Sequence, residues 1–195
     1  MSQTSHPPDL YLARVRGLEL RLRTRPGVFS MKGLDDGTRL LLDQLDLADA
    51  DAVADLGCGA GAIGIAAARL APTAHVHLLD EHLRAVDVAR DNVRLNGVRN
   101  AEVFLSDLFS AVGGERYSHV LSNPPARLGN DFLDELVVAS LAHLRPGGQL
   151  WLVVVSNLRP LFVRLLGRAG ATPEVVARGR QHVLLRARRG RAGRP

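Results

Sequence analysis

The sequence lacks several features that would assign it to other protein classes. Cys58 is its only cysteine, which excludes an internal disulfide and argues against a cysteine-based zinc site. No run approaches the ~18 consecutive apolar residues of a membrane helix, and the first residues lack the hydrophobic stretch of a secretory signal. Its 195 residues, 46% of them hydrophobic, suffice for one domain with a buried core. We therefore expect a soluble, cytoplasmic protein.

Positive charge is concentrated near the two ends of the chain. Residues 10–25 carry five arginines against one glutamate, and residues 186–195 carry five arginines and no acid. These residues are Arg14, Arg16, Arg21, Arg23 and Arg25, then Arg186, Arg188, Arg189, Arg191 and Arg194. Such an excess is typical of a surface that contacts nucleic acid. An arginine-biased composition and a solvated tail explain it equally well, so both readings stay open.

The pattern of apolar residues predicts one domain. We divide the chain into a disordered start at 1–9, a domain at 10–188 and a basic tail at 189–195. Alternation around Gly17 predicts a small N-terminal β-hairpin. Five strands then alternate with helices, and a final pair of strands follows around Gly179. Residues 145–148 are expected to close the helix between the fourth and fifth of these strands. This order predicts an α/β fold with a doubly wound, mostly parallel seven-stranded sheet and an antiparallel edge.

A glycine-rich turn follows the first strand of this alternation. Glycines at alternate positions let the backbone turn sharply and approach a ligand without Cβ clashes. An acid at the end of the next strand, Asp80, would hold ribose hydroxyls. The spacing also fits the dinucleotide fingerprint, so the turn alone does not separate NAD from S-adenosylmethionine (SAM). The turn reads Asp55-Leu56-Gly57-Cys58-Gly59-Ala60-Gly61.

Two features favour SAM. Asp55, before the glycines, suits a positive methionine amino group better than a pyrophosphate. Ser122-Asn123-Pro124-Pro125 ends the fourth strand of the alternation, and its prolines fix the backbone. A carbonyl and the Asn123 amide oxygen then accept hydrogen bonds from one planar –NH2 group, which aims the nitrogen at a methyl group. An Asn-Pro-Pro turn is often only a turn, but its place after the glycine motif and two strand-end acids favours function.

The chain resembles a Rossmann-fold methyltransferase of the family that contains the small-subunit rRNA guanine-N2 methyltransferases. The motifs that carry the resemblance are residues 26–30 (PGVFS), 33–38 (GLDDGT), 55–61, Asp80, 106–109 (SDLF) and 122–125 (SNPP). The resemblance implies SAM as cofactor, with Asp55, Gly57, Gly59 and Gly61 around the methionine half, Asp80 on the ribose, and Asp107 with Leu108 at the adenine. It implies that Asn123 and Pro124 hold the target nitrogen.

The residue after Asn-Pro-Pro departs from the family pattern, which usually has an aromatic side chain there to stack on a base. Ala126 stands at this position. Pro125, Phe29 and Arg127 are therefore our predicted substrate contacts, with Phe132 as a further aromatic candidate. We expect methylation of a guanine amine in rRNA, with RNA as partner. A protein glutamine or small-molecule nitrogen as substrate, and a non-catalytic SAM-binding module, are the alternatives.

No metal site is expected. His75 and His77 fall on one face of a strand, a spacing that can bind a metal ion, but no acid or cysteine partner is evident in the sequence. We assign these two histidines a structural role.

Overall fold

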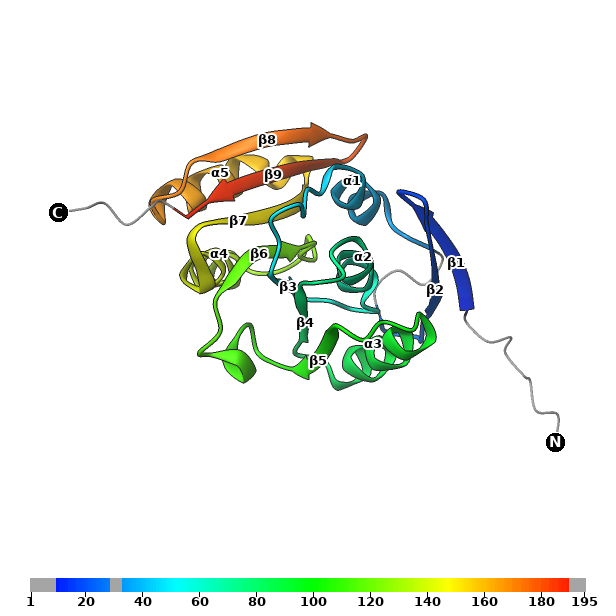
Figure 1. Ribbon diagram of the computed structural model, residues 1–195. Helices are drawn as coiled ribbons and strands as arrows, with labels where there is room; N and C mark the ends of the chain where they lie inside the picture. Colours follow the sequence, from blue (N-terminus) through cyan, green and yellow to red (C-terminus); the bar gives the residue numbers. More distant parts are fainter. Residues whose placement is uncertain (1–9, 29–32, 190–195) are drawn as a thin grey trace.

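The computed structural model describes residues 10–28 and 33–189, and its main feature is a seven-stranded sheet (Figure 1). The strand order is β5-β4-β3-β6-β7-β9-β8, in which β9 pairs antiparallel with both β7 and β8. The strands are β3 (Ala52–Leu56), β4 (His75–Asp80), β5 (Ala101–Leu105), β6 (Tyr117–Ser122), β7 (Leu144–Val155), β8 (Pro173–Arg178) and β9 (His182–Arg188). The predicted fold class is confirmed.

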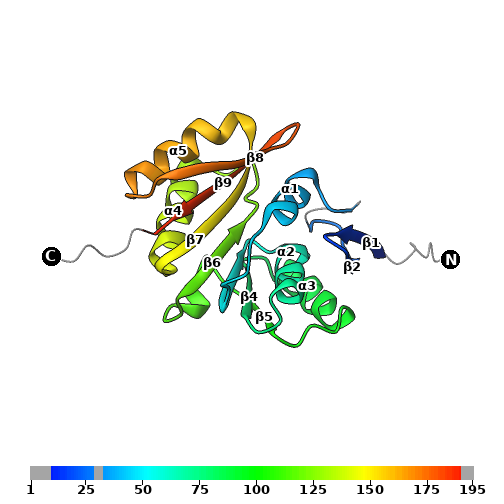
Figure 2. The same ribbon diagram turned by 45° about the horizontal axis from the view of Figure 1, so that its top comes forward.

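Helices cover both faces of this sheet (Figures 1 and 2). Side chains on one face, such as Val53 and Trp151, belong to a core with α1, α2 and α3, while Ala54 and Leu152 face α4 and α5. Alternate residues of the central strands thus enter opposite cores, as expected for strands buried on both faces. The helices are α1 (Asp36–Gln44), α2 (Ala62–Leu70), α3 (Leu83–Leu95), α4 (Asn130–His143) and α5 (Arg159–Arg168), with short 3-10 turns η1 (Ser110–Val112) and η2 (Ser156–Leu158).

The predicted N-terminal hairpin forms a separate two-stranded sheet of β1 (Leu10–Val15) and β2 (Leu18–Arg23) beside α2 and α3 (Figure 1). Two asparagines, Asn92 in α3 and Asn96 at its C-cap, pair with the backbone of β2 as a third strand would. Asn96 accepts from the Arg21 N–H (2.9 Å) and donates to the Arg21 carbonyl (2.7 Å). Asn92 does the same at Arg23, at 2.7 and 2.9 Å. The edge of β2 that faces α3 therefore has its backbone groups satisfied.

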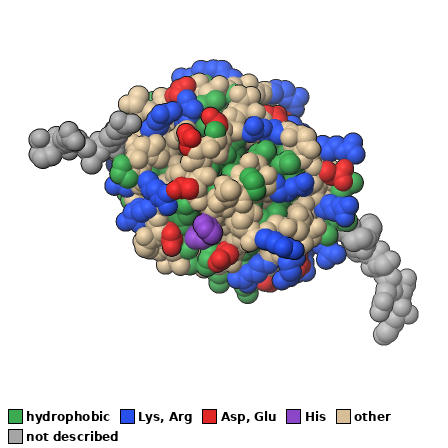
Figure 3. Space-filling view, in the orientation of Figure 1, with side chains coloured by type: hydrophobic (Ala, Val, Ile, Leu, Met, Phe, Trp, Pro, Cys, Tyr) green, Lys and Arg blue, Asp and Glu red, His purple; other side chains and the backbone are tan. Residues whose placement is uncertain are grey.

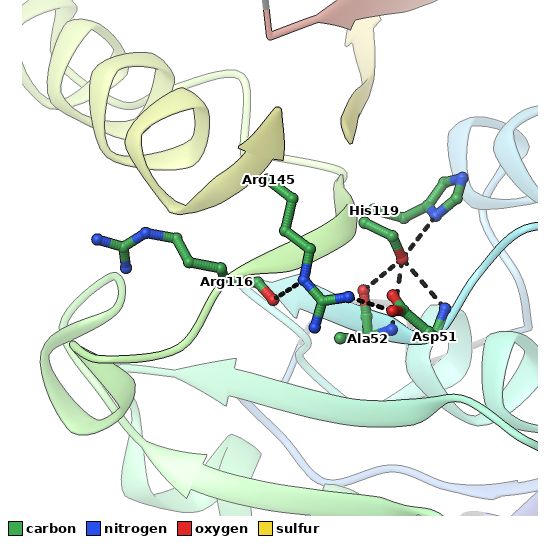
Figure 4. Close-up of polar contacts among 6 residues, drawn as sticks. Asp51, Ala52, Arg116, His119 and Arg145 are labelled. Carbon is green, nitrogen blue, oxygen red and sulfur yellow. Dashed lines mark hydrogen bonds and ion pairs between the residues drawn. The ribbon is translucent and has the colours of Figure 1, made fainter. Parts of the chain in front are cut away.

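A polar cluster joins β3, β6 and β7 at the amino ends of these strands (Figure 4). The Ser118 hydroxyl donates to the Ala52 carbonyl (2.8 Å) and lies 3.1 Å from Nδ1 of the buried His119. Arg145 donates to the Arg116 carbonyl (3.0 Å) and pairs with Asp51. Burial lowers the pKa of His119, which favours its neutral form. The cluster joins the strands at the end of the sheet opposite the cavity described below.

Residues 145–148 differ from the prediction. They were expected as a turn that closes α4, but they belong to β7, which begins at Leu144. The β6–β7 register shifts here, because Tyr117 lies opposite Leu144 and His119 opposite Gln149. Gly147 has a φ of 82°, a left-handed conformation that favours glycine, and a Cβ on Gly148 would lie 3.0 Å from the Tyr117 carbonyl oxygen, so both glycines suit this irregular part of the strand. No helix in the described part of the chain is long and apolar enough to cross a membrane.

Candidate active site at the carboxyl end of the sheet

A cavity of about 270 Å³ lies at the carboxyl ends of β3, β4 and β6. These strands flank the point where the chain order reverses, because β4 lies on one side of β3 and β6 on the other. Open α/β sheets bind ligands at such a switch point. Segments that follow four strands line the cavity, together with the start of α1 and residues from the N-terminal hairpin and its following loop. The cavity therefore collects residues from distant parts of the sequence.

The glycine turn between β3 and α2 forms one wall of the cavity. Gly57, Gly59 and Gly61 have φ values of 72°, 55° and 82°, a region that side chains disfavour. Gly57 and Gly59 line the cavity, and a Cβ on Gly57 would meet no atom within 4 Å. A Cβ on Gly64 would lie 2.5 Å from Leu78 Cγ, so this glycine lets α2 approach β4. The turn thus exposes backbone where a ligand can approach.

Asp80 connects the end of β4 to the glycine turn. Its Oδ2 accepts from the Gly59 N–H at 2.8 Å, and its Oδ1 accepts from the His82 N–H at 2.9 Å. The carboxylate is only 8% exposed but lines the cavity. A carboxylate has about four lone-pair positions, so Asp80 keeps acceptor capacity for a ligand hydroxyl after these two bonds.

Asp55 lies behind the glycine turn rather than on the cavity wall. It is 1% exposed, and its Oδ2 accepts from the Gly64 N–H at 2.7 Å. Its Oδ1 is buried and has no hydrogen-bond partner among the described residues. Burial raises the pKa of Asp55 to about 7, the Gly64 N–H opposes this rise, and the nearby Asp80 adds to it. The sequence pattern suggested that Asp55 faces the methionine half of SAM, and it did not indicate how deeply this side chain is buried.

The segment after β5 contributes Ser106, Asp107 and Leu108 to the cavity. The Ser106 hydroxyl donates to the Leu108 carbonyl (2.9 Å) and accepts from the Ala111 N–H (3.1 Å). These bonds hold Leu108 at a φ of 46°, a left-handed conformation that is uncommon for a leucine. Asp107 is exposed beside it, so a carboxylate stands at the cavity mouth.

The opposite wall contains the Asn-Pro-Pro segment and the start of α1. Asn123, Pro124 and Pro125 follow β6 directly and line the cavity. The Asn123 amide nitrogen donates to Asp35 Oδ1 (3.0 Å) and to Thr38 Oγ1 (3.1 Å). Asp35 is the N-cap of α1, so a helix terminus 88 positions away fixes this side chain.

Most of the predicted site residues that the structure describes meet at this cavity, with three exceptions. Asp55 and Gly61 lie outside its lining, and Arg127 is exposed beyond it. Phe29 falls outside the described residues, although Gly27 and Val28 before it line the cavity. Sequence reasoning missed several lining residues, namely Tyr11, Thr38 and His82. The GLDDGT motif was a usable signal for Thr38, whereas Tyr11 has no motif of its own.

The comparisons with known proteins agree with this geometry. The sequence pattern of the methyltransferase small domain family matches residues 19–186. The chain belongs to this family. Among its relatives, the "Uncharacterized protein YbxB" of Bacillus subtilis is 34% identical over 143 residues, which are 72% of this chain and 71% of that protein. The "Ribosomal RNA small subunit methyltransferase C" of Citrobacter koseri is 36% identical over 173 residues, 87% of this chain and 49% of that protein.

A solved structure also matches. The T. thermophilus "16S rRNA N2 G1207 methyltransferase (RsmC)", in complex with AdoMet and guanosine, superposes with a TM-score of 0.80 and 27% identity. The alignment covers 92% of this chain and 50% of that chain. The chain therefore spans about half the length of these rRNA methyltransferases.

Proposed function

We propose that this chain binds SAM and transfers its methyl group to the exocyclic amine of a guanine in rRNA. One observation supports this more than any other. The glycine turn with Asp80 and the Asn-Pro-Pro segment line one continuous cavity. Cofactor and target nitrogen can therefore meet in it. The similar T. thermophilus protein was solved with AdoMet and guanosine, the same two kinds of ligand.

The residues of the glycine-turn wall fit SAM. Asp80 has spare acceptor capacity for ribose hydroxyls, and the positive φ of Gly57 and Gly59 allows the methionine half to lie against the backbone. The unpartnered Oδ1 of Asp55 lies behind the turn, and the methionine ammonium favours the ionised form of this carboxyl, whose pKa burial raises to about 7. In this proposal Asp107 and Leu108 hold the adenine, and Gly61 starts α2. SAM supplies an electrophilic methyl group on a sulfonium.

The residues of the Asn-Pro-Pro wall position the acceptor. Asn123 Oδ1 and the Pro124 carbonyl accept the two hydrogens of one –NH2 group, while Pro125 contacts the base. Arg127, and Phe29 outside the described residues, remain the further base contacts that the sequence suggests. The lone pair of the nitrogen then points toward the methyl group, and water accepts the proton that leaves after transfer. Such a site accelerates the reaction by orientation and needs no strong base. Phe132 of α4 lines the cavity and offers the aromatic surface that Ala126 lacks.

The hairpin offers the basic surface for RNA. Its inward side chains, such as Leu20 and Leu22, are buried, while Arg14, Arg21 and Arg23 alternate with them on the exposed side. Figure 3 shows arginine side chains at this edge of the molecule, with others spread over the rest of the visible face. Arg14 pairs with Glu19, whereas Arg21 and Arg23 have no ion pair among the described residues. We propose that these arginines contact phosphates.

The C-terminal arginines are less well placed than those of the hairpin to contact RNA phosphates. Arg186 pairs with Glu174 and lies 5.3 Å from the Trp151 ring centroid, and Arg189 donates to the Ala142 and Leu144 carbonyls. Arg188 lies opposite Gln149 at the amino end of the parallel strands, the end away from the cavity. Arg191 and Arg194 lie outside the described residues. We therefore assign the main phosphate contacts to the hairpin.

Two measurements test this function. Calorimetry with SAM, S-adenosylhomocysteine and NAD should detect the first two ligands and not NAD. Incubation with SAM and small-subunit rRNA, followed by mass spectrometry of nucleosides, should detect N2-methylguanosine. Tight NAD binding without SAM binding would refute the cofactor assignment. SAM binding with a methylated protein glutamine or small molecule, and unmodified RNA, would favour the alternative substrates, and SAM binding without transfer would favour a binding module.

A further inference from the structure

The side chain of Asn123 belongs to a closed hydrogen-bond network at the start of α1. Asp35 Oδ1 accepts from the Gly37 and Thr38 N–H groups, at 2.9 and 3.0 Å, and also from Asn123 Nδ2 at 3.0 Å. The Thr38 hydroxyl donates to Asp35 Oδ2 at 2.6 Å and accepts from Asn123 Nδ2 at 3.1 Å. Thr38 is buried, so water does not compete freely for these bonds.

The chemistry of the partners determines which way the amide points. An ionised carboxylate only accepts hydrogen bonds, and the single hydroxyl hydrogen of Thr38 is already donated to Asp35. Both partners of Asn123 are therefore acceptors, and only its –NH2 group satisfies them. A flipped amide would place Oδ1 against a carboxylate oxygen and a hydroxyl lone pair. The network thus settles an orientation that distances alone do not.

We propose that Asp35 and Thr38 are positioning residues that lock the Asn123 amide, so that Oδ1 is the acceptor offered to the target nitrogen. This inference rests on the proposed function. Because Asn123 lines the cavity while its –NH2 group is held at α1, the free oxygen is the part of the amide left for a substrate. Donation to a carboxylate also polarises the amide and strengthens Oδ1 as an acceptor.

The lock predicts a rule for substrates. A nitrogen that carries hydrogens satisfies Oδ1, whereas a ring nitrogen that has only a lone pair meets repulsion from it. A site that is built to hydrogen-bond one group rejects analogues that leave its polar atoms unpaired. The site should therefore select an amino group and reject acceptor-only ring nitrogens of the same base.

The GLDDGT motif acquires a physical explanation from this network. Asp35 caps the helix and accepts from Asn123, and Thr38 completes the lock. Gly37 is required for close approach, because a Cβ there would lie 3.0 Å from Asp35 Oδ1 and 3.1 Å from His182 Cδ2. The motif therefore serves the Asn-Pro-Pro wall of the cavity, which we call the acceptor wall. It does not serve the glycine-turn wall, which we call the cofactor wall.

The decisive variant is Asp35→Asn in the full chain. Asparagine also caps helices, so α1 should be retained. Its –NH2 group, in the place of Oδ2, would donate to Thr38, whose hydroxyl hydrogen would then turn toward Asn123 and favour the flipped amide. We expect kcat for RNA methylation to fall on the order of 10- to 100-fold. The KM for RNA and the affinity for SAM should stay within about twofold, because neither ligand loses a direct contact.

Thr38 provides a matched pair that does not alter the helix cap. Thr38→Val has nearly the same shape but no hydroxyl, and we expect kcat to fall by about tenfold. Thr38→Ser restores the hydroxyl and should recover most of the wild-type kcat, which loss of packing would not explain. If Asp35→Asn fails to fold, this pair decides the question.

The Asn123 side-chain amide gives a readout that does not depend on turnover. Its NMR signals, identified by their loss in Asn123→Ala, should show hydrogen-bonded protons that exchange slowly in the wild type and fast in Asp35→Asn and Thr38→Val. Unchanged amide signals in both variants would overturn the lock. A raised KM with normal kcat would also overturn it, because Asp35 would then contact substrate directly. A wild-type lock without RNA methylation would contradict the proposed function alone.

Discussion

The two walls of the cavity are built by different means. On the cofactor wall, backbone N–H groups of one short stretch hold the carboxylates: Gly59 donates to Asp80 on the wall, and Gly64 donates to Asp55 behind it. On the acceptor wall, side chains hold one another across 88 positions of sequence. Local backbone geometry tolerates changes elsewhere, whereas the side-chain network depends on how α1, which packs on β7 and β9, is placed beside the segment that follows β6. The cofactor wall should therefore be the more robust of the two.

The largest effect should come from the acceptor wall. Asn123→Ala removes the amide oxygen, and we expect kcat to fall on the order of 10²- to 10³-fold. The affinity for SAM, measured by calorimetry, should change little, because Asn123 is not expected to touch the cofactor. If Asn123→Ala lost as much SAM affinity as Asp80→Ala, the distinction between the two walls would be wrong.

The cofactor wall should respond in the opposite way. Asp80→Ala removes the carboxylate that we propose binds the ribose, and we expect SAM binding to weaken by roughly 1.5–3 kcal/mol. At saturating SAM, kcat should recover most of its wild-type value. Loss of the Gly59 contact could also disturb the turn, so Asp80→Asn, which retains one acceptor oxygen, serves as the control and should lose less affinity.

Asp55, which lies behind the cofactor wall, predicts how the stability of the ligand-free protein depends on pH. Its pKa is raised to about 7, so between about pH 4 and 7 the folded protein holds a proton that the unfolded chain releases. The free energy of unfolding therefore falls as pH rises through this window, by at most about 1.4 kcal/mol per pH unit from this group. Asp55→Asn should remove that slope and raise the melting temperature at pH 8.

The same variant should bind SAM less tightly, since the negative charge behind the turn is lost. A thermal-shift series from pH 5 to 8, with and without SAM, measures both effects. Asp43→Asn, on the exposed side of α1, makes the same change of charge and should alter neither the slope nor the affinity. If Asp55→Asn lowers stability at pH 8, the carboxylate is structural rather than poised for the cofactor.

The smallest effects should come from the basic surfaces beyond both walls. Replacing Arg21 and Arg23 by Gln should weaken RNA binding and make the slope of log affinity against log salt shallower by up to ~2, near one unit per lost phosphate contact. Deleting residues 190–195 also removes two arginines, Arg191 and Arg194, and we expect a smaller change than for the hairpin pair. SAM binding should be unaffected in both, and filter binding across a salt series measures the slopes.

An unchanged slope in both proteins would mean that neither segment contacts RNA. This result would favour a protein or small-molecule substrate. A larger change for the tail than for the hairpin would reverse our assignment of the main phosphate contacts.

The sequence indicated which segments form each wall, but not the side-chain network that holds the acceptor wall, and the reason is physical. A strand followed by alternate glycines folds locally, so the positive φ of Gly57 and Gly59 and the place of Asp80 follow from the pattern itself. The bond from Asn123 to Asp35 depends on how α1 packs at the end of β6, and no local signal encodes that contact. The motif containing Asp35 could be recognised, but its purpose could not.

The fold shows the same limit. Alternation predicted the hairpin, and short apolar runs that alternate with helical segments predicted the strands of the sheet, because burial on one face leaves a period of two and burial on both faces leaves a continuous apolar run. It did not predict that residues 145–148 extend β7, since Pro146, Gly147 and Gly148 are typical of turns and only pairing with β6 makes them part of a strand. The depth of Asp55 behind the turn was likewise a matter of packing, not of pattern.

The hydrogen bonds from Asn92 and Asn96 to the backbone of β2 have a consequence for self-association. A free strand edge promotes aggregation, because its unpaired N–H and C=O groups can form hydrogen bonds with a strand of another molecule. Asn92 and Asn96 occupy the edge of β2 that faces α3 with amide groups that imitate a neighbouring strand but cannot propagate the sheet. Two side chains of a helix thus keep this edge of a small arginine-bearing hairpin from extending into a larger assembly, and leave its charged face exposed to solvent.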